Sequence, residues 1–103
     1  MLIQSWTQSK RLKTGNSMEL IKEDKKGKVY RSDEIKIFYR NIGSISGDNN
    51  ENPEELIYLI SGRARVTLED KVDELEAPAK ITFPPKTYHK IEALQDIVFV
   101  LFN

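Results

Sequence analysis

The only histidine of this 103-residue sequence, His89, is the side chain best suited to acid–base chemistry. Histidine is the residue type that changes charge near neutral pH, and it is the most common general acid or base in proteins. It follows the turn signal Pro84-Pro85 and the ring of Tyr88. A single histidine after such a turn is often a hydrogen-bonded structural residue, so a place in a cavity needs further support.

Glu55 is the carboxylate that the strand pattern directs toward the interior. It shares period-2 parity with Ile57 and Leu59, so the three side chains point the same way along a strand. A carboxylate that faces a core needs a partner, which a metal ion, His89 or an arginine would supply. The alternative is an exposed strand end, where water solvates the carboxylate.

Four tyrosines and two arginines are further candidates for ligand binding. Tyrosine rings can stack on the face of a sugar, and Tyr88 beside the histidine is best placed to do so, although such rings are more often part of a core. Arg63 and Arg65 alternate with apolar residues, as on any half-exposed strand. We interpret both as surface residues, the alternative being ligands of a carboxylate or phosphate. The other three rings are Tyr30, Tyr39 and Tyr58.

These residues stand in a chain of short strands without a predicted helix. The segment 56–60 is apolar at every position, which is typical of a strand covered on both faces. Residues 43–53 are rich in turn formers, which predicts a loop at the mouth of a sandwich or barrel. Apolar alternation and turn signals predict about nine strands, at 18–21, 28–31, 34–39, 56–60, 63–68, from 72 onward, 80–83, 90–94 and 96–102.

Composition excludes several classes of function. Sixteen Lys and Arg residues balance sixteen Asp and Glu residues, so the chain has no field to attract nucleic acid or an anionic membrane. The absence of cysteine excludes disulfides, thiolate metal sites and cysteine nucleophiles. The sequence shows neither a signal peptide nor an apolar run long enough to cross a bilayer, so we expect a cytoplasmic protein.

The length fits a single barrel domain at 18–103, preceded by an N-terminal arm at 1–17. The arm has three large apolar side chains, which would be exposed unless the arm lies as an edge strand on its own barrel or on a neighbour's: Leu2, Ile3 and Trp6. An edge-exposed barrel with such an arm favours a homodimer.

Residues 43–102 resemble the conserved core of the cupin superfamily of small jelly-roll barrels. The first cupin motif reads Gly, five residues, His-x-His, three or four residues, Glu, six residues, Gly. Glu55 takes the glutamate position and Gly62 the closing glycine. With four residues before the glutamate, Asp48 and Asn50 stand at the two histidine positions. The resemblance implies an all-β, single-domain cupin jelly-roll β-barrel.

The second cupin motif matches in part. It reads Gly, five residues, Pro-x-Gly, two residues, His, three residues, Asn, and the chain matches it at Pro84 and His89. Pro78, Lys86 and Ala93 stand in place of the two glycines and the asparagine. The chain has therefore kept the turn and the histidine of this motif, but not its glycines.

The resemblance also implies a site for a divalent metal ion. Cupins usually hold the ion with the histidines and glutamate of the first motif and the histidine of the second, which here correspond to Asp48, Asn50, Glu55 and His89. An oxygen-rich set of this kind favours harder ions and binds late transition metals less tightly. With three residues before the glutamate, the first two positions would fall on Asn49 and Glu51. Manganese, iron, nickel and zinc are the candidate ions, and a metal-free site is the alternative.

The function that the resemblance implies is the binding of a polar small molecule, a sugar or an organic acid, in the barrel cavity. The segment 27–47 is similar to small bacterial cupins found among sugar-modifying and surface-polysaccharide genes. In an enzyme of epimerase or isomerase type, His89 would move a proton, Glu55 would ligate the metal or act as the second acid or base, and Tyr88 would orient the substrate. The alternative is a non-catalytic, metal-free cupin that acts as a binding or regulatory module. The residues alone do not decide whether the protein is an enzyme.

Overall fold

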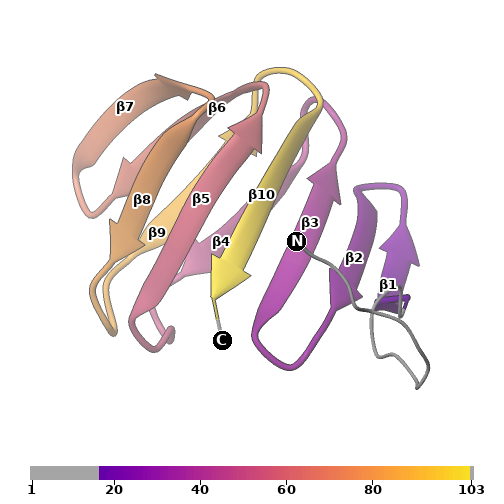
Figure 1. Cartoon of the computed structure of the whole chain (residues 1–103). Helices are drawn as coiled ribbons and strands as arrows, with labels where there is room; N and C mark the ends of the chain where they lie inside the picture. The colour runs from indigo at the N-terminus through magenta and orange to yellow at the C-terminus, as the bar shows by residue number, and fades with distance from the viewer. Residues whose placement is uncertain (1–16, 103) are drawn as a thin grey trace, which may run out of the picture.

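The computed structural model describes residues 17–102, which form ten β-strands and no helix (Figure 1). Within this range there is accordingly no helix that could cross a membrane. The predicted arm at 1–17 lies outside the described residues except for Ser17. The strands are β1 (Glu19–Asp24), β2 (Gly27–Arg31), β3 (Ile35–Arg40), β4 (Ile45–Asn49), β5 (Glu55–Ser61), β6 (Arg63–Leu68), β7 (Lys71–Glu76), β8 (Ala79–Phe83), β9 (His89–Ala93) and β10 (Ile97–Phe102).

The strands form two antiparallel sheets that face each other. The six-stranded sheet has the order β1-β2-β3-β10-β5-β8, and the four-stranded sheet has the order β4-β9-β6-β7 (Figure 1). Strand β10 thus lies between β3 and β5, and β9 lies between β4 and β6, so the chain crosses repeatedly from one sheet to the other. This is the arrangement of a jelly roll, and it confirms the predicted all-β fold.

Alternation along the strands fills the space between the sheets. On β5 and β10 the inward residues Ile57, Leu59, Ile97 and Phe99 are each at most 3% exposed. Their neighbours along both strands point to the opposite face and keep part of their surface accessible. The other strands complete the core with Ala64, Val66, Ile81, Phe83, Ile91 and Ala93.

The prediction that segment 56–60 is covered on both faces is wrong for the described part of the chain. Tyr58 and Ile60 are 36% and 54% exposed on the outward face of β5. The segment is apolar at every position, but the four-stranded sheet packs against only one of its two faces. The outward face of this strand is therefore an exposed apolar surface.

A strand within the predicted loop 43–53 is the second difference. β4 pairs with β9, with Ile45 opposite Glu92, and brings the number of strands to ten. The pairing shifts register at a bulge, where Gly47 and Asp48 have φ angles of +88° and +48°. Turn-forming residues are compatible with an edge strand at a bulge, so local composition did not reveal this strand.

Candidate functional site

A cavity of about 380 Å³ lies between the two sheets, at the end of the barrel where β4 ends and β5 and β9 begin. Its inner wall is apolar because the inward residues of both sheets line it: Phe38, Ile57, Ile91, Phe99 and Leu101. Its polar groups gather at the strand ends and in the loop between β4 and β5: Ser46, Asn49, Glu51, Asn52, Glu55 and His89. A polar rim over an apolar wall is the usual design of a small-molecule site.

Glu55 and His89 meet in this cavity. The Oε1 atom of Glu55 lies 3.4 Å from Nε2 of His89, and the His89 residue is only 3% exposed. Glu55 points inward with Ile57 and Leu59, as their shared parity predicts. The imidazole is held from its other side by Phe83, whose ring centre lies 4.3 Å away.

A backbone carbonyl near His89 is a possible hydrogen-bond partner for one of its ring nitrogens. Nδ1 of His89 lies 3.2 Å from the carbonyl oxygen of Thr87. A carbonyl only accepts hydrogen bonds, so this contact is a hydrogen bond when Nδ1 carries the proton. In the neutral ring Nε2 is then an acceptor and faces a carboxylate that also accepts. When Nε2 carries the proton instead, it can donate to Oε1 of Glu55, so the two groups are placed as an acid–base pair.

Gly47 makes room for the imidazole. A Cβ atom at this position would lie 3.0 Å from Cδ2 and Nε2 of His89 and 3.2 Å from its carbonyl oxygen. The φ angle of Gly47, +88°, is also one that other residues rarely adopt. Strand β4 can therefore pass directly over the ring only because this residue is a glycine.

Asn52 is a cavity residue that the sequence analysis missed. Its side chain is buried, and its Nδ2 group donates to the carbonyl oxygens of Pro53 and Pro84 at 2.8 and 2.9 Å. Its main-chain carbonyl oxygen accepts a hydrogen bond from the main-chain amide of Lys86 at 2.9 Å. Asn52 thus ties the β4–β5 loop to the β8–β9 turn. An Asn-Pro pair in the sequence signals only a turn, and nothing local distinguishes this asparagine from its neighbours.

The structure brings together only two of the four predicted metal ligands. Asp48 and Asn50 are exposed and do not line the cavity, whereas Glu55 and His89 do. Among residues 17–102, no group of three or more His, Cys, Asp and Glu side chains could hold a metal ion. The described residues therefore do not fit the four-ligand metal site implied by the cupin resemblance.

The bulge in β4 explains this difference. The register shift between Gly47 and Asn49 places Asn49 opposite His89 and turns Asp48 away from the cavity. Asn49 and Glu51, the positions of the alternative motif register, line the cavity instead. The amide of Asn49 is used locally, because its Nδ2 donates to the Gly47 carbonyl at 2.7 Å and its Oδ1 accepts from the Glu51 amide at 3.1 Å.

Tyr88 binds Asp48 rather than facing the cavity. Its hydroxyl donates to Oδ1 of Asp48 at 2.6 Å, and its backbone amide donates to Oε1 of Glu69 at 3.1 Å. The hydrogen bond to Asp48 raises the pKa of the Tyr88 phenol, with smaller contributions from burial and from the charge of Asp48. Tyr88 is not a lining residue of the cavity, so contact with a ligand would require this side chain to move.

The remaining candidate residues lie on outer surfaces. Arg65 is bound to Glu74 and Glu92, each at 3.1 Å, and Arg63 lies 3.6 Å from Glu74. These pairs cover the outward face of the four-stranded sheet, because the alternate residues of β6 are buried. The rings of Tyr30, Tyr39 and Tyr58 lie on the outward face of the six-stranded sheet.

One further cation lies behind the cavity wall. The guanidinium of Arg40 is buried 5.3 Å from the ring centre of Phe38, and that ring stacks on Phe99 with 4.6 Å between the centres. Burial lowers the pKa of Arg40, and the charge of Asp24, 3.8 Å away, opposes this shift. The Phe38 ring lines the cavity and Arg40 does not.

Comparison with known proteins identifies the fold. No protein-family model matches the sequence, and no curated protein matches it significantly. An RmlC-like cupin from Shewanella frigidimarina is similar in structure, with a TM-score of 0.70 and 16% sequence identity over 91% of this chain and 90% of that one.

Two further structures share part of their length with this chain. A cupin 2 domain-containing protein from Halorhodospira halophila has a TM-score of 0.62 and 20% identity over 66% of this chain and 49% of its own. The capsular polysaccharide assembling protein CapF from Staphylococcus aureus has a TM-score of 0.69 and 15% identity over 87% of this chain and 29% of its own. The chain spans about half of the first and less than a third of the second. Together with the jelly-roll topology, these similarities show that the chain has the cupin fold.

Proposed function

We propose that the cavity binds a neutral, hydroxyl-bearing small molecule of the sugar class and that Glu55 and His89 exchange a proton with it. The observation that carries the proposal is the 3.4 Å contact between Glu55 and His89 inside a cavity of about 380 Å³. That volume lies at the small end of the range for ligand sites, roughly 300–1,000 Å³, and suits a single small molecule.

The charge of the cavity favours a sugar over an organic acid. Its lining includes two carboxylates, Glu51 and Glu55, and no lysine or arginine within the described residues. An anionic ligand would face these carboxylates without a compensating cation, because the ring of Phe38 separates Arg40 from the cavity. Hydroxyl groups, in contrast, can donate to the carboxylates and to the side chains of Ser46 and Asn49.

The paired groups support proton transfer at a carbon next to a carbonyl. In the tautomer with the ring proton on Nδ1, Nε2 of His89 would take the proton from the carbon, and the electron pair of the broken C–H bond would move toward the carbonyl oxygen as an enolate forms. Glu55 would stabilise the imidazolium that results. Protonation of the same carbon on its opposite face, by solvent or after the ligand turns over, is epimerisation, and protonation at the neighbouring carbon by His89 is isomerisation. The step is balanced without an oxidant.

A divalent metal ion has no role in this step. Manganese, iron, nickel or zinc would find two ligands together, Glu55 and His89, and those two already bind each other. We expect elemental analysis of tag-free protein to find no near-stoichiometric metal, and titration with each ion to leave the melting temperature nearly unchanged. A stoichiometric ion that is lost on Glu55→Gln would contradict this expectation.

The second candidate function is a non-catalytic binding module. It is favoured by the same contact, because a hydrogen bond between Glu55 and His89 would satisfy the buried imidazole without any substrate. In such a module the pair would be part of the cavity wall and would have no proton to exchange with a ligand.

Proton exchange with solvent distinguishes the two candidates. A panel of monosaccharides would first be screened by thermal shift, and bound sugars incubated with the protein in D₂O would be followed by NMR for loss of C–H signals. We expect exchange in the wild type, none in Glu55→Gln or His89→Gln, and unchanged exchange in the control Glu74→Gln on the outer face of the four-stranded sheet. Binding without exchange in the wild type would support the module, and the absence of any bound sugar would overturn the proposal.

The similarity to CapF agrees with a carbohydrate ligand. That protein is described as assembling capsular polysaccharide, and its likeness to this chain concerns the fold. The choice of ligand class therefore depends on the charge of the cavity and on the screen.

A further inference from the structure

The bulge in β4 inserts one residue into the ladder beside His89. Gly47 lies opposite Lys90, so a regular antiparallel ladder would place Asp48 opposite His89. Instead Asn49 stands opposite His89, and Asp48 is the inserted residue of the bulge. The bulge therefore determines which side chain of β4 is the partner of the cavity histidine.

Strand alternation offers two alternative sets of inward residues after Ser46, which lines the cavity. Without a bulge, the parity of Ser46 would continue to Asp48 and Asn50. With the bulge, Asn49 and Glu51 line the cavity. Each set contains one carboxylate and one amide, but in the opposite order along the chain. The bulge thus places the amide first and the carboxylate two residues further on, in the β4–β5 loop.

A hydrogen bond outside the cavity holds the inserted residue. The Tyr88 hydroxyl donates to Oδ1 of Asp48 at 2.6 Å, a length typical of a bond between a hydroxyl and a charged carboxylate. Tyr88 directly precedes His89 in the chain, but neither Tyr88 nor Asp48 lines the cavity. We call this contact the Asp48–Tyr88 clasp.

The tyrosine of the clasp is fixed by the turn between β6 and β7. Its main-chain amide donates to Oε1 of Glu69 at 3.1 Å, and its main-chain carbonyl oxygen accepts a hydrogen bond from the Glu69 amide at 2.8 Å. Two bonds thus hold the backbone of Tyr88 to this turn. The clasp therefore ties the bulge of β4 to a fixed point on the four-stranded sheet.

The bulge needs such contacts because its backbone is unfavourable. Asp48 has a φ angle of +48°, in a region that residues other than glycine seldom adopt, although Asp tolerates it better than most. Inside the loop, Asn49 bonds the Gly47 carbonyl and the Glu51 amide. The clasp adds the contact that the Asp48 side chain itself makes, and it pulls that side chain away from the cavity.

We infer that the Asp48–Tyr88 clasp is a positioning device that selects the residues a ligand meets in the cavity. By holding Asp48 outside, it keeps Asn49 and Glu51 as the lining residues. Tyr88 would thus influence a ligand without touching it, through the register of β4. The consequence for a ligand rests on the proposed function, whereas the control of register does not.

Loss of the clasp would change the surroundings of the acid–base pair. In the regular register the carboxylate of Asp48 would stand opposite His89. A carboxylate only accepts hydrogen bonds, so it would compete with Glu55 for a proton on Nε2 and would repel Glu55 by its like charge. The amide of Asn49 carries no charge and leaves Nε2 to Glu55 and the ligand.

NMR of the ligand-free full chain tests the control of register. We expect cross-strand NOEs between His89 and Asn49 in the wild type. Tyr88→Phe should weaken them and introduce NOEs between His89 and Asp48. Tyr39→Phe is the matched control, because it removes the same hydroxyl from a ring that is 45% exposed on the outer face of the six-stranded sheet. Identical NOEs in the wild type and in Tyr88→Phe would overturn the inference.

Titration with a sugar found in the screen tests the consequence for a ligand. Tyr88→Phe and Asp48→Ala should each raise the Kd roughly two- to tenfold, the effect expected from one hydrogen bond. The double variant should bind no more weakly than the weaker single variant, because both changes remove the same contact. Asp48→Asn keeps an acceptor for the hydroxyl and should recover most of the affinity. Additive losses, or a Kd that neither variant changes, would overturn the positioning role.

The two experiments separate this inference from the proposed function. If the wild type binds no sugar, the proposed function fails, and the NOE comparison still decides whether the clasp holds the bulge. If sugar binds and exchanges its proton but Tyr88→Phe alters neither the NOEs nor the Kd, the clasp inference alone fails.

Discussion

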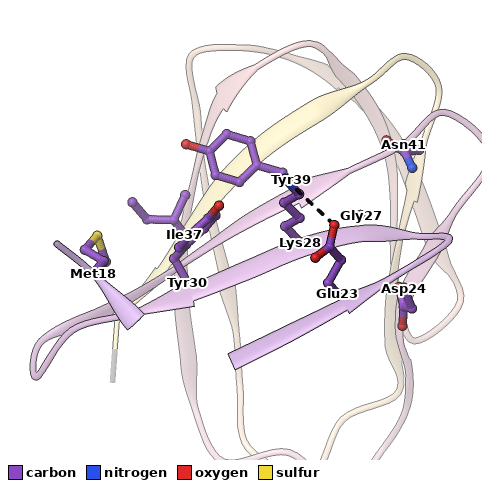
Figure 2. Close-up of a pocket in the computed structure, with 9 residues that line it drawn as sticks. All are labelled: Met18, Glu23, Asp24, Gly27, Lys28, Tyr30, Ile37, Tyr39 and Asn41. Carbon is purple, nitrogen blue, oxygen red and sulfur yellow. Dashed lines mark ion pairs between the residues drawn. The ribbon is translucent and has the colours of Figure 1, made fainter. Parts of the chain in front are cut away.

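The cavity and an outer groove of about 580 Å³ over β1, β2 and β3 lie on opposite faces of β3 (Figure 2). On β3, Phe38 points into the cavity, while Ile37 and Tyr39 line the groove. The cavity contains the titratable pair of buried His89 and partly exposed Glu55, and the groove contains partly exposed tyrosines together with the ion pair of Lys28 and Glu23. Alternation along one strand thus separates the cavity between the sheets from an open groove on the outer face. Changes on one face should therefore leave the property of the other face intact.

Removing one phenylalanine from each face gives the largest expected difference. Phe83 is 1% exposed and contacts the His89 ring, whereas Phe102 is 42% exposed on the outer face. Phe83→Ala should lower the free energy of unfolding by about 3–5 kcal/mol through the cavity it leaves. Phe102→Ala should lower it by roughly 1–2 kcal/mol, because only part of the ring is buried.

Chemical denaturation measures both values. Equal losses in the free energy of unfolding for Phe83→Ala and Phe102→Ala would contradict the distinction between the inward and the outward face. Phe102→Ala should leave ligand binding unchanged, while Phe83→Ala should weaken ligand binding through His89.

Two glycines with nearly the same φ angle sharpen the comparison further. Gly47 and Gly43 have φ angles of +88° and +89°, but only Gly47 would bring a Cβ atom against His89, since a Cβ at Gly43 meets nothing within 4 Å. Gly43→Ala should cost on the order of 1–3 kcal/mol from backbone strain alone. Gly47→Ala should cost more and should also reduce binding in the cavity.

Thermal unfolding and ligand titration of the two alanine variants separate these effects. If both variants lose the same stability and Gly47→Ala binds ligand like the wild type, the close approach of β4 to His89 has no functional consequence.

The smallest expected effect concerns the bridge between Tyr88 and Asp48 at the cavity rim. Hydrogen bonding to Asp48 raises the pKa of Tyr88 above the ordinary value of 10.0. The unfolded chain therefore loses the phenolic proton first as the pH rises. The bridge stabilises the fold fully below pH 10.0, and this contribution is lost as the pH rises through the higher pKa of the folded state.

Ultraviolet titration of the phenolate, with Tyr88→Phe to assign the signal, measures this pKa. Asp48→Asn should move the titration of Tyr88 back toward lower pH, since the charged acceptor is removed. A titration that does not respond to Asp48→Asn would show that the bridge is absent in solution.

Parts of the site were predictable from local pattern, and other parts were not. The parity of Glu55 with Ile57 correctly predicted that the carboxylate faces the interior. Counting four residues back from Glu55 put Asp48 and Asn50 in the cavity, and counting three put Asn49 and Glu51 there. The bulge at Gly47 shifts the register and presents the second pair. A bulge changes which side chains face inward without leaving a reliable mark in the sequence.

The sequence by itself determined the all-β fold, because alternation and turn signals are local properties of the chain. It also determined the motif positions of Glu55 and His89. Only the tertiary structure decided that these two groups meet, that Asn52 ties two loops together, and that Tyr88 binds Asp48. It also decided that the outer face of segment 56–60 remains uncovered in the described chain. The physical reason is that contacts between strands far apart in sequence depend on register and on which sheet packs against which face, and neither is encoded in a short segment.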